Sequence, residues 1–431
     1  MSVASAAAPL LVPLTQLPAD FRARALRWAA GFAHCAYFEP NGLDYPFGPF
    51  ERLLAVAPAG AATTDALTGL GGAAGPAGLR CGFITYDVKN DIEALSSTNH
   101  DGLGWPVLQF FTPRTWLIWR AGTVELHGET EGLLADILAR PETTGGAAPH
   151  VPALRPRLSK ANYLRAVARI RDDIARGEVY ELNLCQEFYA ENVVLDPVDV
   201  FWRLMAASPA PFAGFVRWHT HFLLCASPER FLALRPPLLV SQPIKGTRRR
   251  GATPAEDEQQ RLALLHDEKE RAENLMIVDL VRNDLARVAQ TGTVRVPELF
   301  GLYPFRHLWQ MISTVTADLR PGTDLEAVLR ATFPMGSMTG APKIRAMELI
   351  EYYENARRGL YSGSIGYMWP DGSFDFNVVI RSLQYRADTG YLSFQVGSAI
   401  TYDSDPEREY DECLLKARAL LEVLGTVIDE Q

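Results

Sequence analysis

Consecutive strand-like segments joined by very short turns constrain this chain more than any other feature. FAGFVRW, HFLLCAS and RFLALRP occupy residues 212–218, 221–227 and 230–236 and are rich in aromatic and branched side chains. Such short connections are typical of runs and hairpins of strands, because a parallel crossover needs a dozen residues or more. Helices are expected from Ser159 to Gly177 and over 197–207, 255–289, 324–332, 341–355 and 406–425. Strands in runs, without strict alternation with helices, predict an α+β fold with large, mostly antiparallel sheets.

A stretch rich in Pro, Gly and Thr, at residues 141–158, divides the chain. It separates an N-terminal region, residues 1–150, from a C-terminal domain that we expect to span residues 156–427. The length of 431 residues is enough for about three domains, although one large α+β body is equally allowed.

The charge balance argues against one broad class of function. The chain has 42 Lys and Arg against 51 Asp and Glu, a net charge of −9, whereas a general nucleic-acid binder needs a basic surface. A local basic pocket for a small anionic substrate is still possible. Five scattered cysteines without a CxxC pair predict neither disulfides nor zinc. With no signal-peptide pattern and no apolar run of roughly 18 residues, we expect a cytoplasmic protein that does not enter a membrane.

Two pairs of glutamates with helical spacing are candidate metal ligands. Glu270 and Glu273 share one face of a predicted helix, as do Glu409 and Glu412, with Lys416 further along the same face. Carboxylates so close repel each other unless a cation lies between them, and their oxygens suit Mg²⁺. For one helix alone, a solvated charged face is the more common explanation. Two such helices favour a magnesium site.

Lys245 is the candidate nucleophile. It stands in SQPIKGTRRRG, between Ile244 and Gly246, where a strand leads into a turn. An ordinary surface lysine is the alternative, since most lysines are exposed. Burial beside apolar residues would instead lower the pKa of the amine into the range of a nucleophile.

Two further segments supply candidate groups for an anionic substrate. In FPMGSMTGAPKIRAMELI a Gly-rich turn precedes a predicted helix, so Ser337, Thr339 and the loop amides could hold an anionic oxygen. The turn is not a Walker A motif and does not imply a nucleotide. Tyr361 and Arg381 are expected on adjacent strands, where a phenol and a guanidinium together fit a carboxylate. Ordinary strand residues with partners elsewhere are the alternative.

Taken in order, these motifs resemble those of the chorismate-utilising enzymes. The matching segments are SPERF, PIKGT, AENLMIVDLVRNDL, GSMTGAPKIRAMELI, RGLYSGSIGY, VVIRS, VGSA and YDECLLKA, from about residue 157 to 425. The family includes anthranilate synthase component I, aminodeoxychorismate synthase component I, isochorismate synthases and salicylate synthases. The resemblance implies two large sheets packed as a sandwich with helices outside, to which the N-terminal region adds strands.

The resemblance also implies a chorismate site with one Mg²⁺. Glu273 and Glu412 would ligate the ion, while Glu270 and Glu409 would hold its waters. Glu229 of SPERF matches the general acid that protonates the departing C4 hydroxyl. The implied substrate-binding positions are Thr247, Ser337, Thr339, Tyr361, Arg381, Gly397, Ser398, Ala399 and Lys416.

Two positions favour one branch of this family. Aminodeoxychorismate synthases carry Lys in the PIKGT motif, as Lys245 does here, whereas anthranilate synthases usually carry Ala. Isochorismate and salicylate synthases activate water with a lysine whose position here is Glu181. The resemblance therefore implies amination of chorismate at C4, on the route to p-aminobenzoate and folate, with ammonia from a glutamine amidotransferase partner. Anthranilate synthase component I, isochorismate synthase and a non-catalytic chorismate-binding homologue stay open as alternatives.

Two departures point away from the anthranilate branch. Many relatives carry a histidine where LWQMIS places Gln310. The LLES motif of tryptophan inhibition is also missing from the N-terminal region.

Overall fold

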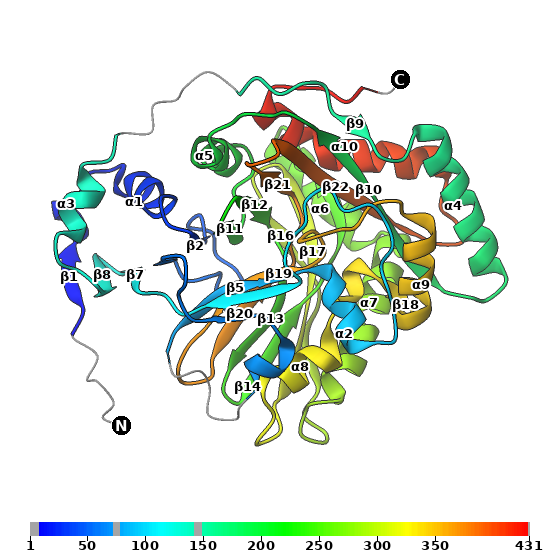
Figure 1. Ribbon diagram of the computed structural model, residues 1–431. Coiled ribbons are helices and arrows are strands. Elements are labelled where there is room, and N and C mark those ends of the chain that lie inside the picture. Colours follow the sequence, from blue (N-terminus) through cyan, green and yellow to red (C-terminus); the bar gives the residue numbers. More distant parts are fainter. Residues whose placement is uncertain (1–7, 72–77, 142–148, 430–431) are drawn as a thin grey trace.

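The strands of the protein form two large antiparallel sheets (Figure 1). The computed structural model describes residues 8–71, 78–141 and 149–429. The first sheet has 12 strands within these residues, in the order β1 (Leu10–Pro13), β8 (Thr123–Gly128), β7 (Thr115–Arg120), β3 (Leu53–Ala57), β2 (His34–Glu39), β11 (Phe212–Trp218), β12 (His221–Ser227), β21 (Ser382–Arg386), β22 (Tyr391–Ile400), β10 (Glu181–Ala190) and β18 (Gly340–Ala341), with β9 (Arg155–Pro156) beside β10.

The second sheet has 10 strands within the same residues. Their order is β15 (Ile244–Arg249), β17 (Leu308–Asp318), β14 (Leu238–Gln242), β13 (Arg230–Arg235), β20 (Phe374–Asn377), β19 (Ser364–Met368), β5 (Arg80–Ile84), β6 (Leu108–Phe111) and β4 (Thr63–Thr64), with β16 (Arg295–Pro304) beside β17. Both sheets combine strands from before and after residue 150. Residues 142–148 of the expected connection lie outside the described residues, and the division into residues 1–150 and 156–427 stays a prediction.

The two sheets pack face to face through a buried core. Phe38 of β2 and Tyr367 of β19 lie in one cluster, with their ring centroids 5.1 Å apart. Gly214 of β11 marks the close approach of the sheets, because a Cβ there would lie 2.5 Å from Cδ1 of Ile365 on β19. The predicted sandwich is confirmed.

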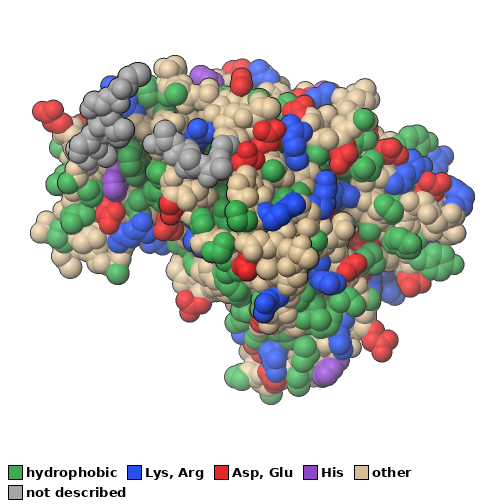
Figure 2. Space-filling view, turned by 90° about the horizontal axis from the view of Figure 1, so that it is seen from below, with side chains coloured by type: hydrophobic (Ala, Val, Ile, Leu, Met, Phe, Trp, Pro, Cys, Tyr) green, Lys and Arg blue, Asp and Glu red, His purple; other side chains and the backbone are tan. Residues whose placement is uncertain are grey.

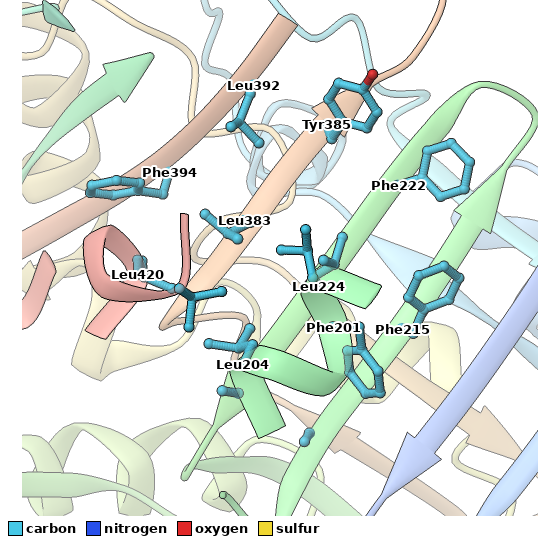
Figure 3. Packing of buried hydrophobic residues seen from close by; sticks show 14 of the residues in the cluster. Phe201, Leu204, Phe215, Phe222, Leu224, Leu383, Tyr385, Leu392, Phe394 and Leu420 are labelled. Atoms are coloured by element: carbon cyan, nitrogen blue, oxygen red, sulfur yellow. The ribbon is translucent and has the colours of Figure 1, made fainter. Parts of the chain in front are cut away.

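Helices cover the outer face of each sheet. The described helices are α1 (Phe21–Ala29), α2 (Lys89–Ile92), α3 (Leu133–Leu138), α4 (Lys160–Ala175), α5 (Pro197–Ala207), α6 (Pro254–Leu265), α7 (Glu268–Ala286), α8 (Leu325–Thr332), α9 (Lys343–Tyr353) and α10 (Pro406–Leu424). Helices α4, α5 and α10 cover the first sheet, and α7 and α8 cover the second. Figure 3 shows the first of these packings, formed by Phe201, Leu204, Phe215, Phe222, Leu224, Leu383, Tyr385, Leu392, Phe394 and Leu420. Each such side chain contributes about 1.5–3 kcal/mol when fully buried.

The expected single helix over residues 255–289 is wrong, because it consists of two helices, α6 and α7. The chain leaves the helical conformation at Asp267, whose side chain accepts a hydrogen bond from the backbone N–H of Glu270 at 3.2 Å. An aspartate is a favourable N-cap residue, so a new helix begins here. Glu270 therefore lies in the first turn of α7.

One face of the protein carries charges of both signs. Figure 2 shows a face on which Lys and Arg side chains are interspersed with Asp and Glu and form no broad basic surface. Among the described helices, none is long and apolar enough to cross a membrane.

Candidate active site

Strand β15 and helix α7 bring Lys245 and the first glutamate pair together. Asn274 of α7 is buried and donates from Nδ2 to the carbonyl oxygen of Lys245 at 3.1 Å. Its Oδ1 accepts a hydrogen bond from Ser313 Oγ on β17 at 2.6 Å. These bonds fix α7 against the sheet. As a result, Glu273 Oε2 lies 4.0 Å from Lys245 Nζ.

Lys245 is ion-paired in this structure. Its side chain is 13% exposed, and Nζ donates to Glu181 Oε1 at 2.9 Å. Burial alone lowers the pKa of the amine, but the carboxylates of Glu181 and Glu273 outweigh burial and raise that pKa above its ordinary value. The expectation that burial makes Lys245 neutral is therefore wrong for this state of the protein, because β10 supplies an acidic partner.

Glu181 is a residue of the site whose contact with Lys245 was not predicted from the sequence. It begins β10 and is 1% exposed. Its Oε2 is buried and has no hydrogen-bond partner among the described residues. A buried polar atom without a partner costs about 1–3 kcal/mol. Such a cost is typical of a functional site, where a substrate or a reacting group completes the contacts.

The glutamates of α7 and α10 share one electrostatic environment. Burial, and then the charges of Glu273, Asp267 and Glu412, raise the pKa of Glu270 to about 7. Burial also raises the pKa of Glu273. The Oε1 atom of Glu273 is buried without a hydrogen-bond partner among the described residues, and Lys269 Nζ lies 3.6 Å from it. Acidic groups held this close favour a cation between them.

Lys416 connects helix α10 to strand β22. Its Nζ lies 2.7 Å from Glu412 Oε1 and donates to the carbonyl oxygen of Gly397 at 2.7 Å. Burial raises the pKa of Glu412, but Lys416 outweighs it, so that this pKa lies below its ordinary value. Glu409, one turn earlier on α10, is buried. The second predicted glutamate pair therefore stands beside the VGSA strand.

These residues fit a shared magnesium site but do not form a complete protein cage. In the described parts of the chain, no three His, Cys, Asp or Glu side chains are placed so that they could hold a metal ion by themselves. Mg²⁺ commonly takes one or two carboxylates and completes its shell with waters and substrate oxygens. The unpartnered oxygen of Glu273 and the raised pKa of Glu270 agree with this partial donor set.

Glu229 has the properties of a general acid. It is 4% exposed, and its Oε1 accepts a hydrogen bond from Ser337 Oγ at 2.7 Å. Burial raises the pKa of Glu229 to about 7, against the opposing effects of Ser337 and of nearby positive charges. A carboxyl group with such a pKa carries a proton part of the time at neutral pH and can donate it to a leaving group.

Tyr361 and Arg381 do not lie on adjacent strands, contrary to expectation. Tyr361 lies in the turn before β19 of the second sheet, and Arg381 directly precedes β21 of the first sheet. The two segments meet where the backbone N–H of Ser362 donates to the carbonyl oxygen of Val379 at 2.9 Å. Arg381 has a φ of 50°, a strained conformation typical of functional sites. Burial lowers its pKa to about 10.

Comparison with known proteins decides the family. The model of the chorismate binding enzymes matches residues 48–422. The chain belongs to this family. It is 34% identical to aminodeoxychorismate synthase component 1 of Bacillus subtilis over 368 residues, which cover 80% of this chain and 76% of that protein. It is 37% identical to anthranilate synthase component 1 of Thermus thermophilus over 357 residues, again 80% and 76% of the two chains.

A third relative is longer than this chain. The chain is 45% identical to the aminodeoxychorismate synthase of Streptomyces griseus over 271 residues, 63% of this chain but only 37% of that protein. Among solved structures, anthranilate synthase component I of Streptococcus pneumoniae superposes with a TM-score of 0.74 at 25% identity, covering 97% of this chain and 92% of that one. The resemblance found in the motifs and the predicted fold are both confirmed.

Other family positions lie on strands β15 and β22. Ser398 Oγ is 3.1 Å from the hydroxyl of Tyr163, and Ala399 follows it on β22. Thr247 is exposed on β15 and pairs with Gln310 of β17. Gln310 is buried, and its Oε1 lacks a hydrogen-bond partner among the described residues. Substrate contacts by Thr247 and by the VGSA strand stay predictions.

Arg358 is a further residue of this chorismate-binding enzyme that was not predicted from the sequence. It is buried, forms an ion pair with Glu354 at 2.6 Å, and donates to the carbonyl oxygens of Met338 and Asn183 at 2.7 and 2.9 Å. Within the same loop, Thr339 Oγ1 donates to the backbone carbonyl oxygens of Met335 and Gly336. Arg358 thus joins the Gly-rich turn to β10. A lone arginine in RGLYSG carries no sequence signal of this role.

Proposed function

We propose that this chain aminates chorismate at C4 to 4-amino-4-deoxychorismate, using ammonia that a glutamine amidotransferase partner supplies. The observation that carries the proposal is Lys245, which stands between Glu181 and Glu273 in the candidate site. Relatives named aminodeoxychorismate synthase, at 34% and 45% identity, support the same assignment.

The chain's own residues would perform the chemistry in two displacements. Lys245 Nζ attacks C2 of chorismate, the two ring double bonds shift, and the C4–O bond breaks. Glu181 Oε1, at 2.9 Å from Nζ, is the acceptor for the proton that the amine loses. Glu229 gives its proton to the departing hydroxyl, which leaves as water. Ammonia then bonds to C4 and the double bonds shift back. Glu181 returns its proton to Nζ, and Lys245 leaves C2 as the amine. Covalent catalysis divides one difficult displacement into two easier ones.

Magnesium would assist at the carboxylates of α7 and α10. We propose that Glu273 and Glu412 ligate it directly, and that Glu270 and Glu409 hold its waters. Bound there, Mg²⁺ would act as a Lewis acid and as a template for the ring carboxylate of chorismate.

Charged and polar groups opposite these helices would orient the substrate. Arg381 and Tyr361 would bind the enolpyruvyl carboxylate, because a guanidinium and a phenol donate to it together. The remaining contacts would come from Thr247, Ser337, Thr339, Gly397, Ser398, Ala399 and Lys416.

Anthranilate synthesis is the second candidate. The Thermus thermophilus relative carries that name and is matched over 76% of its length. Lys245 favours C4 amination over anthranilate synthesis, because direct attack of ammonia at C2 does not use a lysine nucleophile.

A lysine variant tests the proposal. Lys245→Ala should remove amination while chorismate still binds, and Lys160→Ala, a change to an exposed lysine of α4, should leave it intact. Incubation of the wild type with chorismate and Mg²⁺ but no ammonia should add the mass of dehydrated chorismate to the peptide that contains Lys245. Full amination by Lys245→Ala would contradict the covalent role.

A further inference from the structure

A small cavity borders Glu229 and Ser337, between the second sheet and helix α7. Strands β13 and β14 form one wall, Val281 and Leu285 of α7 form another, and the turn at Gly336 closes one end. Its volume is about 20 Å³. A cavity needs about 10–15 Å³ to hold one water molecule. The space therefore fits a single molecule of the size of water or ammonia.

The hydroxyl groups around this cavity can accept hydrogen bonds but have no proton left to donate. Ser241 and Thr332 each donate their hydroxyl proton to a backbone carbonyl oxygen, at 2.8 Å in both cases. Ser337 donates its proton to Glu229 Oε1 at 2.7 Å. These oxygens keep only lone pairs for a guest. Ammonia brings three N–H donors where water brings two, so that this wall suits ammonia better.

The charged groups along the cavity already have partners. Arg230 directs its guanidinium to Asp375 and Gln242, at 2.8 and 2.6 Å. Asp284 accepts from Lys343 Nζ at 2.6 Å. With these charges neutralised, and while Glu229 keeps its proton, the cavity provides no free counter-charge for an ammonium ion. Burying an unpaired charge is costly, so the neutral NH₃ molecule is the form that fits.

The proposed amination requires a molecule of this kind at this place. Glu229 protonates the C4 hydroxyl, which departs as water, and ammonia then bonds to the same carbon. Ammonia must therefore arrive next to the group that has just lost its proton. The new C4–N bond leaves an extra proton on nitrogen, which the Glu229 carboxylate takes up. The acid is thereby restored for the next turnover.

We propose that the cavity bordered by Glu229, Ser337 and Val281 holds ammonia before it attacks C4. The inference rests on the proposed function, because only a reaction that consumes ammonia gives the cavity this role. It names the place on this chain that ammonia from a partner subunit, or from solution, has to reach.

Filling the cavity tests the inference. Val281→Ile adds one methylene to a wall residue, and Val278→Ile makes the same change at a buried position of α7 that does not line the cavity. With ammonium chloride as the amine at fixed pH, Val281→Ile should raise KM for ammonium at least about tenfold, or ~1.4 kcal/mol. KM for chorismate should change less than about twofold in both variants.

A second variant covers the case in which Val281→Ile folds poorly. Val281→Ala enlarges the cavity and should raise kcat/KM for methylamine relative to ammonium, again by about tenfold. If the wild type aminates chorismate but neither variant changes the use of amines, the cavity inference is wrong and the proposed function stands. If the wild type makes no C4-aminated product from ammonium, the proposed function and the cavity inference are both wrong.

Discussion

Replacing Glu229 by glutamine should stabilise the protein while it removes activity. Raising the pKa of this carboxyl from 4.5 to about 7 means that its charged form costs roughly 3 kcal/mol more in the folded protein than in the unfolded chain, at ~1.36 kcal/mol per pH unit. Below about pH 4.5 both states are protonated and the cost is absent. As the pH rises through 7, the folded protein bears the full cost. Glu229→Gln removes it.

Urea unfolding of matched proteins at several pH values measures this effect. The stability advantage of Glu229→Gln over the wild type should grow from about 0.8 kcal/mol near pH 5 to about 3 kcal/mol near pH 8.5. Glu131→Gln, a change at an exposed residue in the turn before α3, is the control and should show no such trend. The variant should not aminate chorismate, because an amide cannot serve as the acid. A stability difference that does not vary with pH would refute the argument that burial raises this pKa.

Three further predictions concern residues around the site. Asn274→Ala leaves the buried carbonyl of Lys245 without its donor and should lower the free energy of unfolding by about 2–4 kcal/mol, measured in urea. A loss below about 1 kcal/mol would contradict the role of Asn274 in holding α7 against β15. Arg358→Gln leaves Glu354 buried and unpaired and should cost about 3–5 kcal/mol, part of which Glu354→Gln restores in the double variant; no recovery would speak against the pair. Glu273→Gln should raise the Mg²⁺ concentration that turnover requires, whereas Glu407→Gln, on the exposed face of α10, should not. If both variants require the same Mg²⁺ concentration, Glu273 is not a metal ligand.

Most of the architecture follows from local sequence signals. The bounds of β11 and β12 were predicted from their aromatic and branched residues, and the two strands form a hairpin. The equally short connection from β12 to β13 forms no hairpin, because β13 belongs to the second sheet. The helix over residues 255–289 was predicted too long, because an aspartate inside a charged, helix-forming segment gives no clear break. The cap at Asp267 becomes visible only in the fold.

The errors within the site have a different cause, since they involve contacts between distant segments. Glu181 and Lys245 are 64 positions apart, and neither residue shows in the sequence that it faces the other. The same limit applies to Tyr361 and Arg381, which precede strands of different sheets. Motifs of the family named the candidate residues, but the charges that raise the pKa of Lys245 come from Glu181 of β10 and Glu273 of α7.

The identity of the product tests the central claim most directly. The purified chain should be incubated with chorismate, Mg²⁺ and ammonium at mildly alkaline pH, and the product identified by mass and ultraviolet spectrum, with and without added aminodeoxychorismate lyase. We predict a non-aromatic amino product that the lyase converts to p-aminobenzoate. Fluorescent anthranilate formed without the lyase would contradict C4 amination and the role assigned to Lys245.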